Sequence, residues 1–273
     1  MTPFGARLHA AVAERGPLCA GIDPHDALLA AWGLDPGVAG LERFALTAAE
    51  ALAPRVAVVK PQSAFYERFG SRGVAVLERV VTACREAGAL VLLDVKRGDI
   101  GSTTQAYADA YLDPASPIAA DAITASPYLG VGSLDPMVET ARRHGTGVFV
   151  LALTSNPEGP EVQEARSPSG RAVADVVLDR LRDLNAGATP LGSFGAVVGA
   201  TVDPGAHDLA FNGPILAPGY GAQGGTDDDL RRVFGAGLGS VLPSTSRELL
   251  GGGADGLADA ADRLNDRLRR LAG

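Results

Sequence analysis

The sequence predicts a single α/β domain over residues 1–273, in which strands and helices alternate. Three observations support this fold class. The length suits one α/β barrel, and hydrophobic residues make up 46% of the chain, enough for a large core. Short, uniformly apolar runs, typical of parallel strands buried on both faces, alternate with amphipathic stretches. Eight such runs predict a closed (β/α)8 TIM barrel. The runs are residues 18–22, 56–59, 89–95, 119–124, 148–153, 195–200, 214–217 and 239–242.

Helical patterns lie between these runs. Residues 41–53 form one, and residues 73–87 form another, which Gly88 ends as a C-cap. In residues 172–185 and again in 256–271, apolar side chains recur at helical spacing. A doubly wound open sheet is the alternative arrangement, because periodicity alone does not distinguish it from a barrel.

Two segments are predicted to be long loops. Residues 154–170 contain three prolines and show no helical period, and residues 218–229 contain four glycines. Long loops inside a compact domain often serve as lids or binding loops. We therefore expect these two segments to border a functional site.

Composition and charge disfavour several classes of function. A net charge of −8 argues against nucleic-acid binding, because phosphate backbones need Lys/Arg surfaces. Cys19 and Cys84 form no metal-ligand or redox pair and the four histidines are scattered, so we expect no metal site. The N-terminal residues lack a signal-peptide pattern, and no apolar run approaches the roughly 20 residues of a membrane span. We expect a cytoplasmic protein without membrane association.

Four charged residues gather at the ends of two neighbouring strands. In residues 91–104, VLLDVKRGDIGSTT, Asp94 and Lys96 alternate along a strand, so their side chains share one face. Lys60 ends the preceding apolar run, and Asp99 follows on the loop. Adjacent strands lie about 4.8 Å apart, so these groups can meet at the carboxyl end of the barrel, where TIM-barrel active sites lie. The alternative is an ordinary surface ion pair, but four alternating charges favour a catalytic cluster.

The ends of the last two strands predict a site for an anion. Glycines in residues 218–225 let backbone N–H groups approach an anion closely, and Arg247 opens the helix after the eighth run. TIM barrels often hold a phosphate between these two loops, where an arginine supplies two donors. Asp23 ends the first run, either as an Asp-Pro turn or as an acceptor for sugar hydroxyls. Ser155 ends the fifth run, where it can also be a turn or cap residue.

Six motifs of the chain resemble, in the same order, those of the orotidine 5'-monophosphate decarboxylase family. They are GIDP, VVKPQ, DVKRGDIGST, TSNPEG, PGYGAQGG and STSREL. The Asp-x-Lys-x-x-Asp element alone also occurs in related sugar-phosphate decarboxylases, whereas its combination with PGxGAQGG is specific. The longer loops resemble an actinobacterial subgroup of the family. Arg97 and Gly98 depart from the commoner small or apolar pair, which bears on loop contacts and not on the chemistry.

The resemblance implies an enzyme that converts orotidine 5'-monophosphate into UMP and carbon dioxide in pyrimidine synthesis, without a cofactor or metal. In this family Lys96 would be the general acid that protonates carbon 6 of the pyrimidine. Asp94 would lie beside the substrate carboxylate, and Lys60 would bridge Asp94 and the ribose. Asp99 would complete the catalytic set from the neighbouring subunit.

The resemblance also implies a homodimer with shared active sites, into which Asp99, Ile100 and Thr103 reach from the partner. Asp23 would bind ribose hydroxyls, Ser155 the pyrimidine, and Arg247 the phosphate, to which Gln223 links the pyrimidine loop. The implied substrate-binding residues are Asp23, Ile100, Thr103, Ser155, Pro218, Gln223, Gly224, Ser246 and Arg247.

Two alternatives remain open. A sugar-phosphate decarboxylase or a Schiff-base aldolase would also use a barrel lysine. A Schiff-base lysine needs a lowered pKa, however, and the carboxylates expected beside Lys96 act in the opposite direction. A non-catalytic nucleotide-binding barrel belongs to another functional class, and the presence of all four charges disfavours it.

Overall fold

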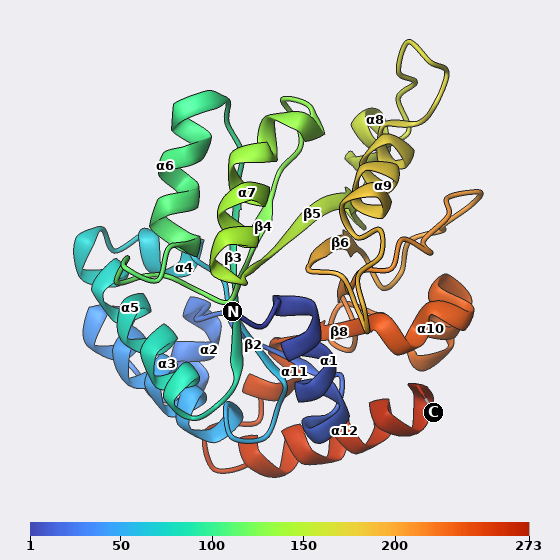
Figure 1. Ribbon diagram of the computed structural model, residues 1–273. Helices are drawn as coiled ribbons and strands as arrows, with labels where there is room; N and C mark the ends of the chain where they lie inside the picture. Colours follow the sequence, from blue (N-terminus) through green and yellow to red (C-terminus); the bar gives the residue numbers. More distant parts are fainter. Residues whose placement is uncertain (273) are drawn as a thin grey trace.

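The strands of the computed structural model, which describes residues 1–272, pair in parallel in the order of the sequence (Figure 1). The first strand also pairs with the last, Cys19 lying opposite Ser244, and this pairing closes the sheet. The predicted TIM barrel is therefore confirmed, and the open sheet is excluded. The strands are β1 (Cys19–Ile22), β2 (Val58–Pro61), β3 (Leu90–Arg97), β4 (Ala122–Ala125), β5 (Gly147–Leu153), β6 (Phe194–Val198), β7 (Ile215–Pro218) and β8 (Val241–Thr245).

Helices surround the barrel, except that residues 199–214, between β6 and β7, form an irregular connection. The α-helices are α1 (Phe4–Arg15), α2 (Asp26–Ala31), α3 (Val38–Leu52), α4 (Ala64–Glu67), α5 (Ser71–Glu86), α6 (Gly101–Leu112), α7 (Asp135–His144), α8 (Gly159–Gln163), α9 (Val173–Leu184), α10 (Asp227–Phe234), α11 (Arg247–Leu250) and α12 (Leu257–Ala272). Two 3₁₀-helices are η1 (Val131–Leu134) and η2 (Gly235–Ser240).

Several predicted boundaries differ from the structure, among them the end of the predicted loop 218–229, because α10 already begins at Asp227. The predicted loop 154–170 contains the short helix α8. This helix has only five residues and begins with Gly-Pro, so the sequence shows no helical periodicity there. The eighth strand begins at Val241, because residues 235–240 form η2. Strands β2, β3 and β8 continue beyond their apolar runs into polar residues. An apolar run therefore marks only the apolar part of a strand, and the polar continuation, which is also buried in β2 and β8, is the part that reaches the carboxyl end of the barrel.

The barrel interior is a packed core that α1 covers at the amino end. Phe4 of α1 is fully buried and meets Phe149 of β5 edge to face, with ring centroids 6.0 Å apart. Burying one phenylalanine side chain contributes about 1.5–3 kcal/mol. Two glycines make room for these rings: a Cβ on Gly147 would lie 2.5 Å from Phe4 Cδ1, and one on Gly195 would lie 2.5 Å from Phe149 Cδ1.

A second, larger core fills the layer between the strands and the outer helices. Both cysteines are buried, and burial raises the pKa of the Cys19 thiol to about 11 and that of Cys84 to about 12. Within residues 1–272, no helix combines the length and apolar character that crossing a membrane requires. The same residues contain no group of three or more His, Cys, Asp and Glu side chains arranged to hold a metal ion.

Candidate active site

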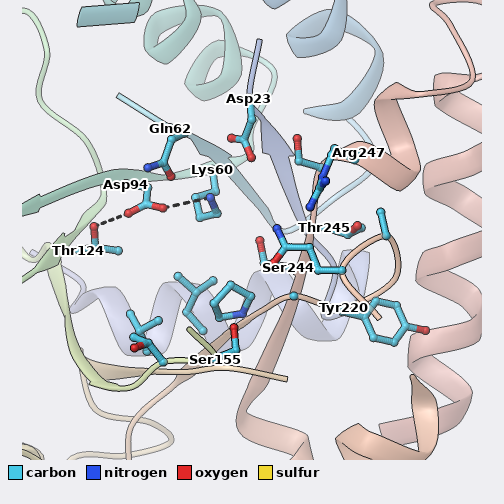
Figure 2. Close-up of a pocket in the computed structure, with 18 of the residues that line it drawn as sticks. Asp23, Lys60, Gln62, Asp94, Thr124, Ser155, Tyr220, Ser244, Thr245 and Arg247 are labelled. Atoms are coloured by element: carbon cyan, nitrogen blue, oxygen red, sulfur yellow. Dashed lines mark hydrogen bonds and ion pairs between the residues drawn. The ribbon is translucent and has the colours of Figure 1, made fainter. Parts of the chain in front are cut away.

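A cavity of about 330 Å³ opens at the carboxyl end of the barrel (Figure 2). Its floor is apolar, with Leu151, Val197 and Leu216 from three successive strands. Its walls are polar and come from strand ends and the loops that follow them. The polar lining residues are Asp23, His25, Lys60, Gln62, Asp94, Lys96, Thr124, Thr154, Ser155, Asn156, Tyr220, Gln223, Ser244, Thr245, Ser246 and Arg247.

Three of the four charged residues predicted to meet at two strand ends, Lys60, Asp94 and Lys96, do so on one wall. Asp94 is buried, and its Oδ2 lies 3.3 Å from Lys60 Nζ while its Oδ1 lies 2.6 Å from Lys96 Nζ. Burial alone would raise the pKa of Asp94, but the two ammonium groups outweigh it and lower the pKa to about 2. Burial would lower the pKa of Lys60, but Asp23 and Asp94 raise it above its ordinary value. Both groups are therefore charged at neutral pH.

The backbone at Lys96 departs from the regular strand that the alternation predicts. Its φ is +46°, in the left-handed region that non-glycine residues rarely adopt. The pairing of β3 with β4 is interrupted in the same place, between Leu93 and Arg97. The two side chains share the cavity as expected, but a local bulge brings Lys96 to Asp94. Such strain is characteristic of functional sites.

Two uncharged residues that the sequence did not single out complete the cluster. Thr124 of β4 donates from Oγ1 to Asp94 Oδ1 at 2.7 Å. Gln62 follows β2 and pairs with Asp94 in an isolated bridge. With its amide oriented to satisfy both neighbours, Gln62 donates to Asp94 Oδ2 and accepts from Lys96 Nζ at 3.2 Å. Each carboxylate oxygen of Asp94 therefore has two donors.

The wall formed by the ends of β1 and β8, next to β2, offers groups that are free to bind a ligand. Asp23 follows β1, and its Oδ1 is buried with no hydrogen-bond partner within residues 1–272; Ser246 Oγ has the same property. Arg247 is exposed at the start of α11 beside the cavity (Figure 2), and no carboxylate of residues 1–272 pairs with it. Buried groups without partners are costly, so a ligand with hydroxyls and an anionic group would satisfy this wall.

The glycine-rich segment after β7 folds back on itself. The Gly225 N–H donates to the Gly219 oxygen at 3.0 Å, and the Gly221 N–H donates to the Gly225 oxygen at 2.9 Å. Gly219 and Gly221 have φ values of +95° and +75°, which a side chain would strain. This tight loop places Gln223 at the cavity, together with Pro218 at the end of β7.

Four of the predicted site residues do not line the cavity of this chain: Asp99, Ile100, Thr103 and Gly224. Asp99 Oδ1 accepts the Ile100 N–H at 2.8 Å, and the carboxylate that pairs with Lys96 is Asp94. Ile100 is 61% exposed, which is unusual for a large apolar side chain. Asp99, Ile100 and Thr103 lie where β3 leads into α6, at the rim of the barrel.

Two neighbours of the site have separate roles. Arg97 turns away from the cavity: it pairs with Glu67 and lies 5.7 Å from the Tyr107 ring centroid, between α4 and α6. His25 lines the cavity and stacks on Phe65, with ring centroids 4.1 Å apart. The motif position of His25, two residues after Asp23, is the only signal in the sequence that could have indicated its place.

Comparison with known proteins gives a consistent result over the whole chain. A family model described as orotidine 5'-phosphate decarboxylase / HUMPS family matches residues 16–251. The chain is 68% identical to the orotidine 5'-phosphate decarboxylase of Nocardioides sp., over 98% of this chain and 100% of that protein. It is 67% identical to the enzyme of the same name from Salinispora arenicola, over 97% and 96% of the two chains.

Solved structures agree. A crystal structure from Streptomyces avermitilis superimposes with a TM-score of 0.97 at 60% identity, covering 100% of this chain and 96% of that one. The orotidine 5'-monophosphate decarboxylase of Leishmania donovani gives a TM-score of 0.79 at 31% identity, covering 99% of both. The relatives at 67% and 68% identity are actinobacterial orotidine 5'-phosphate decarboxylases. The fold, the cavity and the similarity over nearly the full length show that the chain belongs to the orotidine 5'-phosphate decarboxylase / HUMPS family.

Proposed function

We propose that the protein is a carboxy-lyase that converts orotidine 5'-monophosphate into UMP and carbon dioxide, the last step of UMP synthesis. One observation carries this proposal at the level of geometry: Lys60, Asp94 and Lys96 form a single ion-paired cluster beside an apolar floor. The cavity also has the buried oxygens of Asp23 and Ser246 and the guanidinium of Arg247, which suit a ribose and its phosphate.

The chemistry requires such a cluster. When the bond between carbon 6 and the carboxylate breaks, its electron pair stays on carbon 6, where the ring offers no position to delocalise it. A fixed ammonium beside the developing anion stabilises it without reorganisation. We assign this role to Lys96, whose Nζ then transfers a proton to carbon 6 as carbon dioxide leaves. Since the Lys96 side chain is 45% exposed, water can return the proton.

Asp94 keeps the ammonium in place and adds a second effect. Its charge is fixed by two lysines, so the substrate carboxylate would approach a carboxylate that cannot readily become neutral. Loss of carbon dioxide relieves this repulsion. Lys60 joins Asp94 to Asp23 electrostatically and would extend the cluster toward the ribose. The reaction that we propose uses no cofactor, because the charges of the chain perform each step.

Substrate binding would use the wall formed by the ends of β1 and β8. We assign the ribose hydroxyls to Asp23, whose Oδ1 awaits a donor, and the phosphate to Arg247 with Ser246. The Gly224 N–H donates to the Gly221 oxygen at 2.7 Å, so Gly224 would reach the phosphate only if the loop rearranges when the ligand binds. Ser155 and Gln223 would contact the pyrimidine, next to Pro218. Binding energy from the distant phosphate can align the ring against Lys96, so it serves catalysis and not binding alone.

We further propose a homodimer with shared active sites. Ile100, Tyr128 and Leu129 are 61%, 78% and 53% exposed on the connections that follow β3 and β4. Such exposed apolar side chains mark interaction surfaces. A partner packed there would receive Asp99 and Thr103 at its own cavity rim, as the family resemblance implies. The expected cytoplasmic location also stays a prediction, which fractionation of cells would test.

The first test is the ultraviolet absorbance of orotidine 5'-monophosphate mixed with purified protein and a chelator. We expect the spectrum to change to that of UMP, because the proposed reaction needs no metal. An unchanged spectrum with folded protein would contradict the proposal and turn attention to a sugar-phosphate substrate with added magnesium. Borohydride in the presence of substrate separates the aldolase alternative, since only a Schiff base would be trapped on Lys96.

A further inference from the structure

One hydroxyl group contacts both halves of the ion-paired cluster. Thr124 Oγ1 donates to Asp94 Oδ1 at 2.7 Å and accepts the backbone N–H of Lys96 at 2.9 Å. The threonine is 1% exposed and lines the cavity from β4, whereas both residues that it binds belong to β3 (Figure 2). The hydroxyl thus links a side chain and a backbone group two residues apart on the neighbouring strand.

The contact coincides with the irregularity in β3. Regular pairing with β4 stops after Leu93, which lies opposite Ile123, and resumes at Arg97, opposite Ala125. Thr124 is therefore the β4 residue that faces the bulge. The Lys96 N–H points to the threonine side chain, and the left-handed backbone of Lys96 needs such a partner to persist.

The direction of these hydrogen bonds is fixed. A backbone N–H can only donate, so the threonine oxygen accepts there and gives its single proton to Asp94. Asp94 Oδ1 therefore accepts from both the threonine hydroxyl and Lys96 Nζ, while Oδ2 accepts from Lys60 and Gln62. The carboxylate is held at both oxygens, and Thr124 connects it to the backbone that carries the proposed proton donor.

We propose that Thr124 is a positioning residue for the decarboxylation: its hydroxyl holds the Asp94 carboxylate and the Lys96 backbone in one fixed relation. This inference rests on the proposed function. A substrate carboxylate beside Asp94 would push that side chain away, and a relaxed bulge would move the Lys96 ammonium from carbon 6. The shared hydroxyl opposes both movements, so the cluster keeps its geometry when the negative charge of the substrate arrives.

The test compares Thr124→Val, which keeps the shape and removes the hydroxyl, with Thr124→Ser, which keeps the hydroxyl. We expect the valine variant to lose roughly 10- to 100-fold in kcat/KM, chiefly in kcat, as for other hydrogen bonds to charged groups. Its affinity for UMP should stay unchanged, because Thr124 on β4 contacts none of the groups proposed to bind the phosphate and ribose, which follow β1 and β8. The serine variant should recover most of the activity.

The matched control is Thr146→Val, since Thr146 is also a buried threonine, and its hydroxyl has no partner within residues 1–272. It precedes β5 at the amino end of the barrel, so this variant should keep the kcat/KM of the unmodified enzyme. If Thr124→Val does not fold, Thr124→Ala against Thr124→Ser provides the same comparison of a missing and a present hydroxyl.

A measurement without substrate separates this inference from the proposed function. Carbon-13 NMR of labelled aspartate should show a higher pKa for Asp94 in Thr124→Val than in the unmodified protein, whatever reaction the protein catalyses. A failure of the unmodified protein to decarboxylate would refute the function and the catalytic role of Thr124 with it, whereas the Asp94 pKa would still show whether the hydroxyl holds the carboxylate. Unchanged kcat/KM in the valine variant, a serine variant as slow as valine, or an unchanged Asp94 pKa would each overturn the inference.

Discussion

Lys96 combines an ion pair with a strained backbone, and its side chain is the group that we expect the reaction to depend on most. Replacing it by alanine should leave a folded protein, because the side chain is half exposed, yet lower kcat by several orders of magnitude. Single-turnover assays with high enzyme concentration, together with circular dichroism, measure both effects. Near-normal turnover of Lys96→Ala would remove the lysine from the role of proton donor.

Arg247 is a residue whose replacement we expect to weaken ligand binding directly. Its guanidinium has no carboxylate partner in residues 1–272, so Arg247→Ala should weaken UMP binding by roughly 10- to 100-fold without loss of stability. Calorimetric titration with UMP measures this. Arg270→Ala removes the same charge from an exposed position of α12 and serves as the control. Equal UMP affinity in Arg247→Ala and the unmodified protein would exclude the arginine from the phosphate site.

Charge decided which members of the ion-paired cluster the sequence could reveal. Lys60, Asp94 and Lys96 were predictable because charged residues rarely end buried strands, so their presence needs a reason. Thr124 and Gln62 were not, because uncharged polar residues are common at strand ends. Their importance depends on groups from other strands, at distances that only the folded barrel defines.

At the scale of elements, the sequence predicted the strands better than the segments between them. Apolar runs locate β1 through β8 because both faces of each strand are buried, whereas α8 and η2 are short and carry no periodic signal. The bulge in β3 was equally hidden. Alternation of Asp94 and Lys96 is compatible with a regular strand, and the left-handed backbone of Lys96 arises from contacts with β4.

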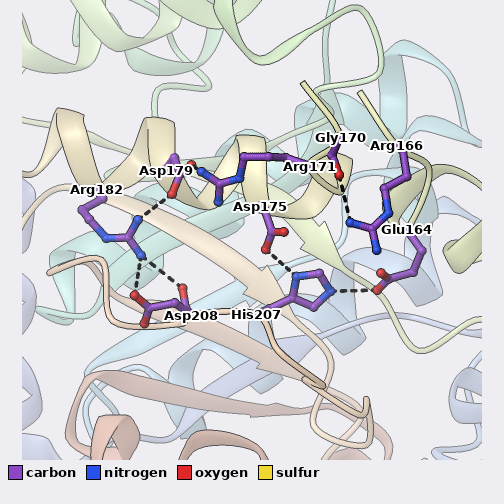
Figure 3. Close-up of polar contacts among 9 residues, drawn as sticks. All are labelled: Glu164, Arg166, Gly170, Arg171, Asp175, Asp179, Arg182, His207 and Asp208. Carbon is purple, nitrogen blue, oxygen red and sulfur yellow. Dashed lines mark hydrogen bonds and ion pairs between the residues drawn. The ribbon is translucent and has the colours of Figure 1, made fainter. Parts of the chain in front are cut away.

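Two of the connections at the carboxyl end are joined by one histidine. His207, on the irregular connection after β6, binds Asp175 of α9 through Nδ1 at 2.6 Å (Figure 3). It binds Glu164, next to α8, through Nε2 at 2.8 Å. Burial by itself would lower the pKa of His207, but the two carboxylates raise it above its ordinary value. The contacts of His207 with these two carboxylates therefore hold α8 and α9 to the loop after β6 most firmly when the imidazole is charged.

The sign of the pH effect follows from this raised pKa. The stabilisation is fully present below the unfolded-state pKa, about 6.5, and is lost as pH rises through the higher folded-state pKa. His207→Gln should therefore lower the melting temperature more at pH 6 than at pH 9. Thermal unfolding at both pH values measures this, with His9→Gln on the exposed side of α1 as the control. An equal loss of melting temperature at both pH values would contradict a charged His207 that binds the two carboxylates.

At the scale of the whole molecule, the proposed dimer predicts that two inactive variants can restore activity to each other. Lys96→Ala and Asp99→Ala chains should each be nearly inactive alone, because each lacks one of the charges that the shared site combines. In a mixture of the two, half of the dimers are mixed and one of their two sites is intact, so about a quarter of the normal activity should return. Differently tagged chains allow the mixed dimer to be purified and assayed. No recovery in the mixed dimer would refute shared sites.

The helix that covers the amino end of the barrel has a consequence for synthesis. The Gly5 N–H donates to Ser193 Oγ at 3.0 Å, and Arg7 pairs with Asp121 at 2.6 Å, so α1 depends on residues made much later. A ribosome that adds about 5–20 residues per second needs roughly 10–40 s to advance from residue 5 to residue 193. During that interval α1 and its buried Phe4 have no completed surface to pack against. The nascent chain therefore keeps the apolar side of α1, with Phe4 and Leu8, in water until the strands that cover it have been made.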